Sequence, residues 1–241
     1  MQFLIPLIDF YTAYRRRIEA WERPLTIAIA IVYGAIGVGL LSFGTEFKPD
    51  SLSYINAYSS RLPLFPALLQ VYKLIDPGFR FFHVLQLGVS AGVFRSLFLF
   101  LRQRGLPWDL AHLSIFCCMV PYLSYVPIGN VVLTEAFTLC LFLLCLMQFE
   151  KFWENPVSFK PLFGACGYLL CILLVRKQFL FILVFFCLAL VIEKTRHKSI
   201  PLIKSLVLII GIGLIATLTE YSANKIRFGQ WSPTPIMGHQ A

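Results

Sequence analysis

The stretch LTIAIAIVYGAIGVGLLSF, from Leu25 to Phe43, contains no charged residue and decides the fold class. A helix that crosses the hydrocarbon core of a bilayer needs about 20 apolar residues, and this stretch is of that length. The whole chain agrees, because 58% of its residues are hydrophobic and 14% are charged, whereas soluble proteins have about 45–50% and about 25%. The composition excludes a soluble enzyme, a soluble nucleic-acid-binding domain and a disordered chain. It predicts an all-α, polytopic integral membrane protein.

Further apolar stretches predict about seven transmembrane helices in all. After the first span they cover residues 81–101, 110–126, 131–149, 161–175, 179–192 and 202–219. Only Arg176, Lys177 and Gln178 separate the fifth stretch from the sixth, and both stretches are short. A single span here would hold two charges at the midplane of the bilayer, where charged side chains are costly. We therefore expect two short helices with these charges at one membrane face.

Three segments organise the chain around these spans. Residues 1–23 have apolar side chains at roughly helical spacing, which predicts an amphipathic helix in the membrane interface. Residues 24–219 are expected to form the seven-span membrane domain, with short membrane-parallel helices in its outer loop, residues 44–80. Residues 220–241 are expected to be a polar tail on the outer side.

The basic residues set the expected orientation. With the N-terminus in the cytoplasm and the C-terminus outside, most of the 21 lysines and arginines lie on the cytoplasmic side, as the positive-inside rule requires. We expect this orientation in the plasma (inner) membrane, where membrane lipids surround the chain. The net charge of +9 is then explained by membrane sidedness, and no nucleic acid is expected as a partner.

Four short motifs lie on the expected outer side. The first outer loop contains PDSLSYINA at residues 49–57 and RLPLFP at residues 61–66, while LTEAF covers residues 133–137 and LLVRK residues 173–177. These motifs and the seven-span layout resemble the GT-C superfamily of membrane glycosyltransferases, which includes the protein mannosyltransferases and the aminoarabinose transferases of lipid A. Members of that superfamily usually continue beyond the seventh span, so the chain resembles their N-terminal core.

The resemblance implies an enzymatic activity and a residue that acts as the general base. It implies transfer of a sugar from a polyprenyl-phosphate donor to a lipid, glycan or protein acceptor on the outer face of the membrane. Asp50 would accept the proton of the acceptor or orient it, because the attacking group must lose a proton as it attacks. The alternative for Asp50 is the N-terminal cap of a short helix, a position that aspartate favours.

The resemblance also implies residues that bind the substrates. Arg176, Lys177 and Arg61 would bind the donor phosphate, since basic side chains make charge-assisted hydrogen bonds to phosphate. Ordinary contacts with lipid headgroups are the alternative for Arg176 and Lys177, and a simple loop end is the alternative for Arg61. Glu135 would hold a donor hydroxyl or pair with Arg176, unless it only stabilises a helix N-terminus. Tyr54 would line the pocket, unless it is an ordinary interfacial tyrosine.

No cofactor is expected, and the lipid-linked sugar is a substrate. The four histidines share no metal-binding spacing, so we expect no metal site and no requirement for a divalent metal. The alternative functions are a non-catalytic membrane subunit, which includes a truncated glycosyltransferase, and a lipid or solute transporter. Many transporters are built from repeated halves, and no such repeat is visible in this sequence.

Overall fold

The fold is helical throughout the part of the chain that the structure describes. The computed structural model describes residues 5–56, 61–123, 128–196, 201–229 and 231. The only β contact in these ranges is an isolated bridge between Glu46 and Val131, so the expectation of an all-α protein is confirmed. The helices in chain order are α1 (Ile5–Ser42), α2 (Pro49–Ile55), α3 (Leu64–Lys73), α4 (Phe82–Gln103), α5 (Trp108–Met119), the 3-10 helix η1 (Val120–Tyr122), α6 (Thr134–Glu154), α7 (Lys160–Val175), the 3-10 helix η2 (Lys177–Phe179), α8 (Leu180–Arg196) and α9 (Leu202–Phe228).

Among the described residues, four helices are long and apolar enough to cross a membrane. They are Glu22–Ser42 within α1, and α4, α6 and α9. The apolar helices at Lys160–Val175 and Leu180–Ile192 are shorter. The expected span at residues 110–126 begins as α5, which has 12 residues and is therefore about 18 Å long. That is less than the hydrocarbon thickness of about 30 Å, so helix length alone supports four spans and not seven.

Two expected boundaries fall inside helices. α1 runs without a break from Ile5 to Ser42 with Pro24 in its interior, so residues 1–23 and the first span share one helix over the described residues. A proline within a transmembrane helix is tolerated because other groups satisfy the freed carbonyl. At the other end of the chain, α9 continues past Thr219 to Phe228 and ends at Gly229, whose φ is +72°. The first part of the expected polar tail is therefore helical, and residues 230 and 232–241 lie outside the described part.

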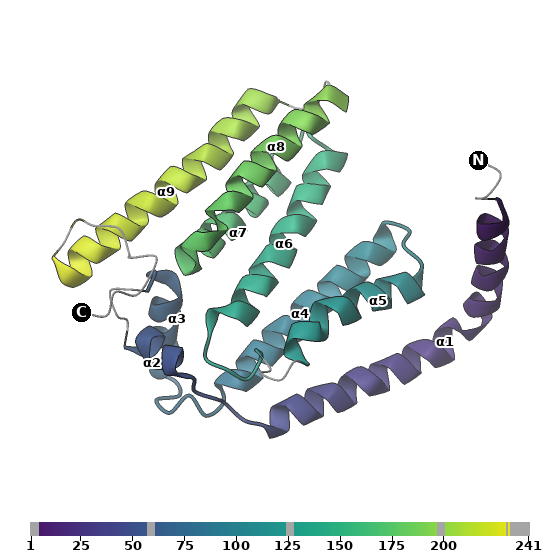
Figure 1. Ribbon diagram of the computed structural model, residues 1–241, viewed down its shortest axis with the longest axis horizontal. Coiled ribbons are helices and arrows are strands. Elements are labelled where there is room, and N and C mark those ends of the chain that lie inside the picture. The colour runs from purple at the N-terminus through teal and green to yellow at the C-terminus, as the bar shows by residue number, and fades with distance from the viewer. Residues whose placement is uncertain (1–4, 57–60, 124–127, 197–200, 230, 232–241) are drawn as a thin grey trace.

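The last four helices form an up-and-down bundle. Figure 1 shows α6, α7, α8 and α9 lying side by side with alternating direction. Their core is fully apolar at its centre, where Phe149 of α6 stacks on Phe186 of α8 with ring centroids 3.8 Å apart. α6 and α7 also come close enough for the thiol of Cys145 to donate to the carbonyl of Ala165 at 3.4 Å. This bundle supports the turn between α7 and α8.

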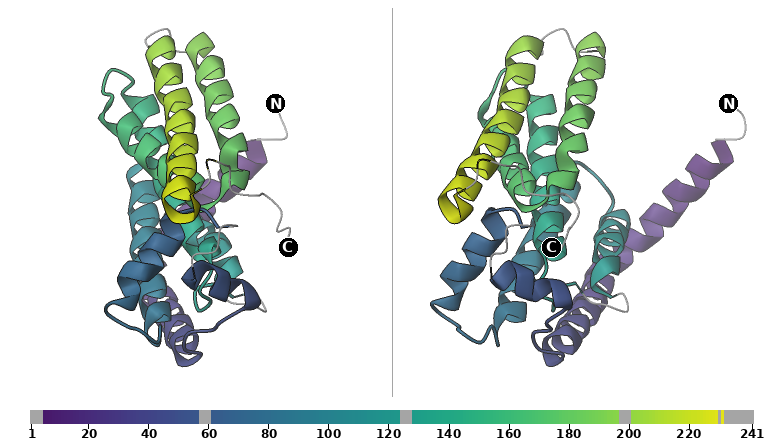
Figure 2. Two further views of the ribbon diagram at one scale, coloured as in Figure 1. Left: turned by 90° about the vertical axis from the view of Figure 1, so that its left-hand side faces the viewer. Right: turned by 60° about the vertical axis from the view of Figure 1, so that its left-hand side comes forward.

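The first half of the chain packs around α4 and leaves α1 at the edge. α4 lies beside α5 and against α6, whereas α1 extends away from the remaining helices (Figure 2). Figure 1 places the C-terminal end of α1, the N-terminal ends of α4 and α6, and the short helices α2 and α3 on the same lower side. The opposite ends carry ion pairs of their own, including Arg104 with Glu154 at 2.6 Å and Arg102 with Glu22 at 3.2 Å. The polar residues that the sequence singles out are therefore collected at the lower side.

Candidate functional site

Asp50 lies in the first turn of α2 and not at its cap. The cap residue is Lys48, whose backbone N–H donates to the hydroxyl of Ser51 at 3.0 Å. The alternative interpretation of Asp50 as a helix cap is therefore wrong by two residues, because Pro49 already occupies the first helical position. The side chain of Asp50 is 69% exposed, and its Oδ1 accepts a hydrogen bond from Nη2 of Arg61 at 2.6 Å.

Arg61 joins three side chains of α2. Its Nε donates to the hydroxyl of Ser53 at 2.6 Å, and its guanidinium lies 4.3 Å from the centre of the Tyr54 ring. Nη1 also donates to the hydroxyl of Tyr54 at 3.3 Å. We call Asp50, Ser53, Tyr54 and Arg61 the Asp50 cluster. Arg61 does more than end the loop, because its contacts fix the orientation of the carboxylate.

A second group of polar side chains lies between α6 and α7. Glu135 is in the first turn of α6, and Arg176 is the residue that ends α7. Nε of Arg176 donates to the hydroxyl of Thr134 at 2.6 Å, and Nη2 donates to Oε1 of Glu135. Of the roles considered for Glu135, the structure shows the pairing with Arg176, and it also places the carboxylate at the N-terminus of α6. We call these three residues the Glu135 cluster.

The Glu135 cluster has one unsatisfied acceptor. Oε2 of Glu135 is buried and has no hydrogen-bond partner among the described residues. A buried acceptor without a partner is costly, so a donor from a bound molecule would be favourable there. Lys177, the neighbouring phosphate-binding candidate, begins η2, and its side chain lies outside what the structure describes.

An apolar layer lies between the two clusters. The ring of Tyr54 contacts Phe65 with centroids 5.3 Å apart, and Phe65 contacts Phe137 at 6.1 Å. Val175, the neighbour of Arg176, belongs to the same group of buried residues. Within the described ranges, no hydrogen bond or ion pair joins one cluster to the other. The candidate residues therefore form two separate polar groups that share one hydrophobic support.

An apolar groove of about 510 Å³ begins at the Glu135 cluster. It follows α6 from Glu135 to Leu146, a distance of about 16 Å at 1.5 Å per residue. Aromatic side chains of α8, including Phe181 and Phe185, form the facing wall. Glu135 and Arg176 are the charged residues of its lining, so the groove combines a charged end with a long apolar body.

Sequence reasoning did not single out three polar residues that hold this end of the molecule together. Nδ2 of Asn130 donates to the carbonyls of Leu40 at 2.6 Å and Gly44 at 3.0 Å, which fixes the end of α1 to the segment before α6. The hydroxyls of Thr134 and Ser53 each accept a hydrogen bond from an arginine of the two clusters. The available signal was position for two of them, because Asn130 borders the apolar stretch 131–149 and Thr134 lies near its start, and both are polar without being charged.

The structure gives no group suited to a metal within the described residues, where no three His, Cys, Asp or Glu side chains gather. In the comparisons with known proteins, no family model, no curated protein and no solved structure matches this chain.

Proposed function

We propose that this chain is a membrane glycosyltransferase of the GT-C type, which moves a sugar from a polyprenyl-phosphate donor to a lipid, glycan or protein acceptor on the outer face of the membrane. The observation that carries the proposal is the position of Arg176 and Glu135 at the end of a 510 Å³ apolar groove. A polyprenyl phosphate has the same division, with an anionic head on a long apolar chain. The ligand and the groove are therefore complementary in both charge and polarity.

The donor would bind with its phosphate at Arg176 and Lys177 and its chain along α6 and α8. Arg176 has a planar guanidinium that matches phosphate oxygens in a bidentate arrangement, and its present partner is Glu135. Phosphate would take over part of that pairing. The Glu135 carboxylate, whose Oε2 has no partner in the described part of the chain, would then accept a hydrogen bond from a sugar hydroxyl.

The acceptor would bind next to Asp50. The attacking oxygen or nitrogen of the acceptor forms a bond to the anomeric carbon, and its proton passes to the Asp50 carboxylate. The bond from the anomeric carbon to the phosphate oxygen breaks, and polyprenyl phosphate leaves with that electron pair. Tyr54 and Arg61 position Asp50 through the contacts of the Asp50 cluster.

This function requires both clusters to face the outer side, which a seven-span arrangement provides. In that arrangement the four long helices cross the membrane together with three short segments, which are α5 with η1, α7 and α8. The membrane is the plasma (inner) membrane, and the N-terminus lies in the cytoplasm. Support comes from the basic end of the helices opposite the clusters, where Arg102 and Arg104 lie. Basic residues are enriched on the cytoplasmic side of membrane proteins.

The direct test is sugar transfer in membranes that contain the protein. We expect the wild-type protein to consume a labelled polyprenyl-phosphate sugar. Asp50→Asn should lower the transfer rate at least a hundredfold at unchanged expression, because a general base accelerates a reaction by about 10²–10⁴-fold. Asp109→Asn should leave the transfer rate unchanged. Asp109 is a matched control, since it is also an aspartate in the first turn of a helix. Full transfer by Asp50→Asn would exclude Asp50 as the base.

A non-catalytic lipid-binding subunit is the second candidate, and one observation favours it. Both acidic candidates already pair with an arginine, Asp50 with Arg61 and Glu135 with Arg176. Crosslinking with a photoreactive polyprenyl phosphate separates the two functions. The subunit would be supported if the protein transfers no sugar, if Arg176→Gln reduces the crosslinking, and if Arg104→Gln leaves the crosslinking intact. Arg104 is the matched control because it too is paired with an acid.

A further inference from the structure

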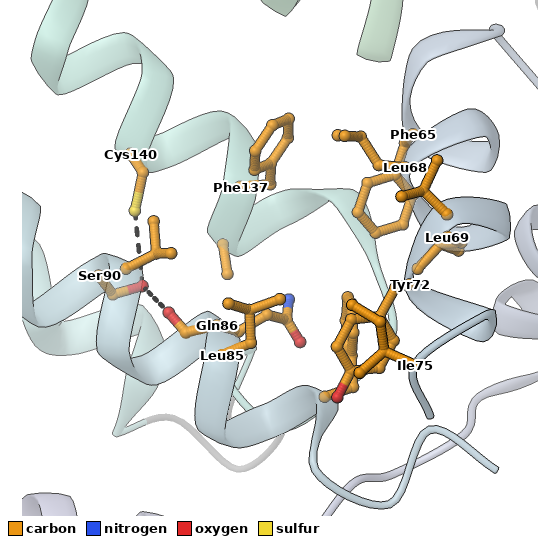
Figure 3. A pocket seen from close by; sticks show the side chains of 14 residues that line it. Phe65, Leu68, Leu69, Tyr72, Ile75, Leu85, Gln86, Ser90, Phe137 and Cys140 are labelled. Atoms are coloured by element: carbon orange, nitrogen blue, oxygen red, sulfur yellow. Dashed lines mark hydrogen bonds between the residues drawn. The ribbon is translucent and has the colours of Figure 1, made fainter. Parts of the chain in front are cut away.

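A second cavity lies between α3, α4 and α6, away from the groove of the Glu135 cluster. Its volume is about 270 Å³. Figure 3 shows its walls, with Phe65, Leu69 and Tyr72 from α3, and Leu85 and Gln86 from α4. The lining includes no charged residue, so an ion bound there would lose its hydration without gaining a counter-charge.

Gln86 makes this cavity unusual. The residue is only 8% exposed, and both Nε2 and Oε1 are buried without a hydrogen-bond partner in the described part of the chain. Its side-chain amide points into the space between α3 and α4 (Figure 3). An unsatisfied buried donor or acceptor destabilises the folded protein, and native structures contain few of them. A donor and an acceptor thus stand side by side in an apolar cavity.

The neighbouring polar groups do not satisfy Gln86. The hydroxyl of Ser90 bonds to that of Tyr122 at 2.6 Å, and the hydroxyl of Tyr72 donates to Asp76 at 3.2 Å. A buried water needs two to four polar partners, and this cavity offers it little beyond one amide. Water alone is therefore a poor occupant.

We propose that the cavity binds the head of a free fatty acid in its neutral form, with the carboxyl group paired to the amide of Gln86. A protonated carboxyl carries a donor and an acceptor side by side, which matches the two free atoms of the amide. The ester of an ordinary phospholipid only accepts, so it would leave Oε1 of Gln86 unsatisfied. The pairing removes both unsatisfied groups at once.

The rim of the cavity explains how such a ligand enters. Four exposed apolar side chains form this rim: Val71 and Ile75 on the α3 side, and Leu85 and Val89 on the α4 side. A chain leaving the cavity would therefore lie in the hydrocarbon of the membrane. Gln86 is four residues into α4, about 6 Å from the helix start, which is close to the interface where carboxyl groups of fatty acids lie. This site does not depend on the proposed sugar transfer.

The test uses the full chain in nanodiscs and a photoreactive diazirine analogue of dodecanamide as the probe. Dodecanamide has the same side-by-side donor and acceptor as a neutral acid and carries no charge at any pH. We expect unlabelled dodecanamide to displace the probe at a concentration about tenfold lower than methyl dodecanoate, which lacks the donor. A tenfold difference corresponds to about 1.4 kcal/mol. Dodecanoic acid should compete better at pH 5.5 than at pH 8.

Variants separate the pairing from general lipid affinity. Gln86→Leu should abolish the preference for the amide and should not lower the Tm of the ligand-free protein, because it removes two unsatisfied groups. Val89→Trp at the rim should block crosslinking, whereas Val207→Trp on the exposed side of α9 should leave it unchanged. Equal competition by amide and ester, a preference that survives in Gln86→Leu, or crosslinks outside α3, α4 and α6 would each overturn the proposal.

Discussion

α1 and α6 are both long apolar helices, yet they have opposite surroundings. The membrane-length window of α1, Glu22–Ser42, is the more hydrophobic of the two, but only 6% of it is buried inside the protein, against 50% for α6. α1 touches the other helices mainly along α4 and leaves Ile27, Ile31 and Val38 exposed. Hydrophobicity therefore identifies a helix that can cross a membrane without telling which helix forms the core.

Polar residues distinguish the two helices better than apolar ones. α6 carries Thr134 and Glu135 in its first turn, and both side chains accept hydrogen bonds from Arg176 at the end of α7. In lipid such groups need partners within the protein, so they mark a helix that faces other helices. Between Leu25 and Leu41, α1 has two polar side chains, Thr26 and Tyr33, and the hydroxyl of Tyr33 donates to the carbonyl of His112 at 3.3 Å.

The largest loss of stability should come from truncating a core side chain of α6. Phe149→Ala removes a fully buried ring that stacks on Phe186, and such truncations cost about 3–5 kcal/mol. Ile31→Ala on α1, where the side chain is 67% exposed, should change stability by less than about 0.5 kcal/mol. Unfolding by titration with a denaturing detergent measures both. Similar losses in the two variants would show that α1 is packed against a surface in the same way as α6.

The next largest loss of stability should come from breaking the ion pair of α6, and breaking the ion pair of α1 should cost less. Arg176→Leu should lower the free energy of unfolding by about 2 kcal/mol, because it leaves the half-buried Glu135 without a counter-charge. Adding Glu135→Leu should restore most of that loss. Arg102→Leu, which breaks the more exposed pair with Glu22 of α1, should cost less than about 1 kcal/mol. A double variant as unstable as Arg176→Leu alone would contradict the interpretation.

A smaller effect concerns the connection between the two regions. Asn130→Ala removes the hydrogen bonds to the carbonyls of Leu40 and Gly44, at about 1 kcal/mol of local stability. Hydrogen exchange should rise at the C-terminal end of α1 while α6 stays protected. Asn56→Ala, at an exposed asparagine, is the control. Equal exchange in both variants would show that Asn130 does not hold α1.

The smallest effect is a pH dependence in the loop before α4. The backbone N–H of Phe81 donates to Asp76 at 2.8 Å and is the main reason why the pKa of Asp76 lies below its ordinary value of 3.8. The folded loop therefore gains stability above that ordinary pKa, and loses it as the pH falls through the lowered one. Hydrogen exchange at residues 77–81 should rise in that acidic range, and Asp76→Asn should remove the dependence. Protection that stays constant in the wild type would exclude this role.

The sequence suggested the candidate residues and, of their two pairings, only that of Glu135 with Arg176. Asp50, Arg61, Glu135 and Arg176 were singled out by the motif resemblance described above, and the scarcity of charges near a membrane supports that choice. Sequence spacing could not show that Arg61 returns to Asp50 or that Arg176 reaches Glu135, 41 residues away. Gln86 was not foreseen, since a single glutamine in an apolar stretch differs from an exposed one only by what surrounds it.

By itself, the sequence determined that the chain is helical and belongs in a membrane, because both properties follow from local composition: a bilayer selects long apolar stretches, and a helix satisfies its own backbone. Tertiary structure decided the rest. It made α6 part of the core and left α1 at the edge, it separated the charges into two paired clusters, and it enclosed Gln86 without a partner. Each of these depends on which helix faces lie against one another, and in lipid that choice comes from packing and a few polar contacts that hydrophobicity does not encode.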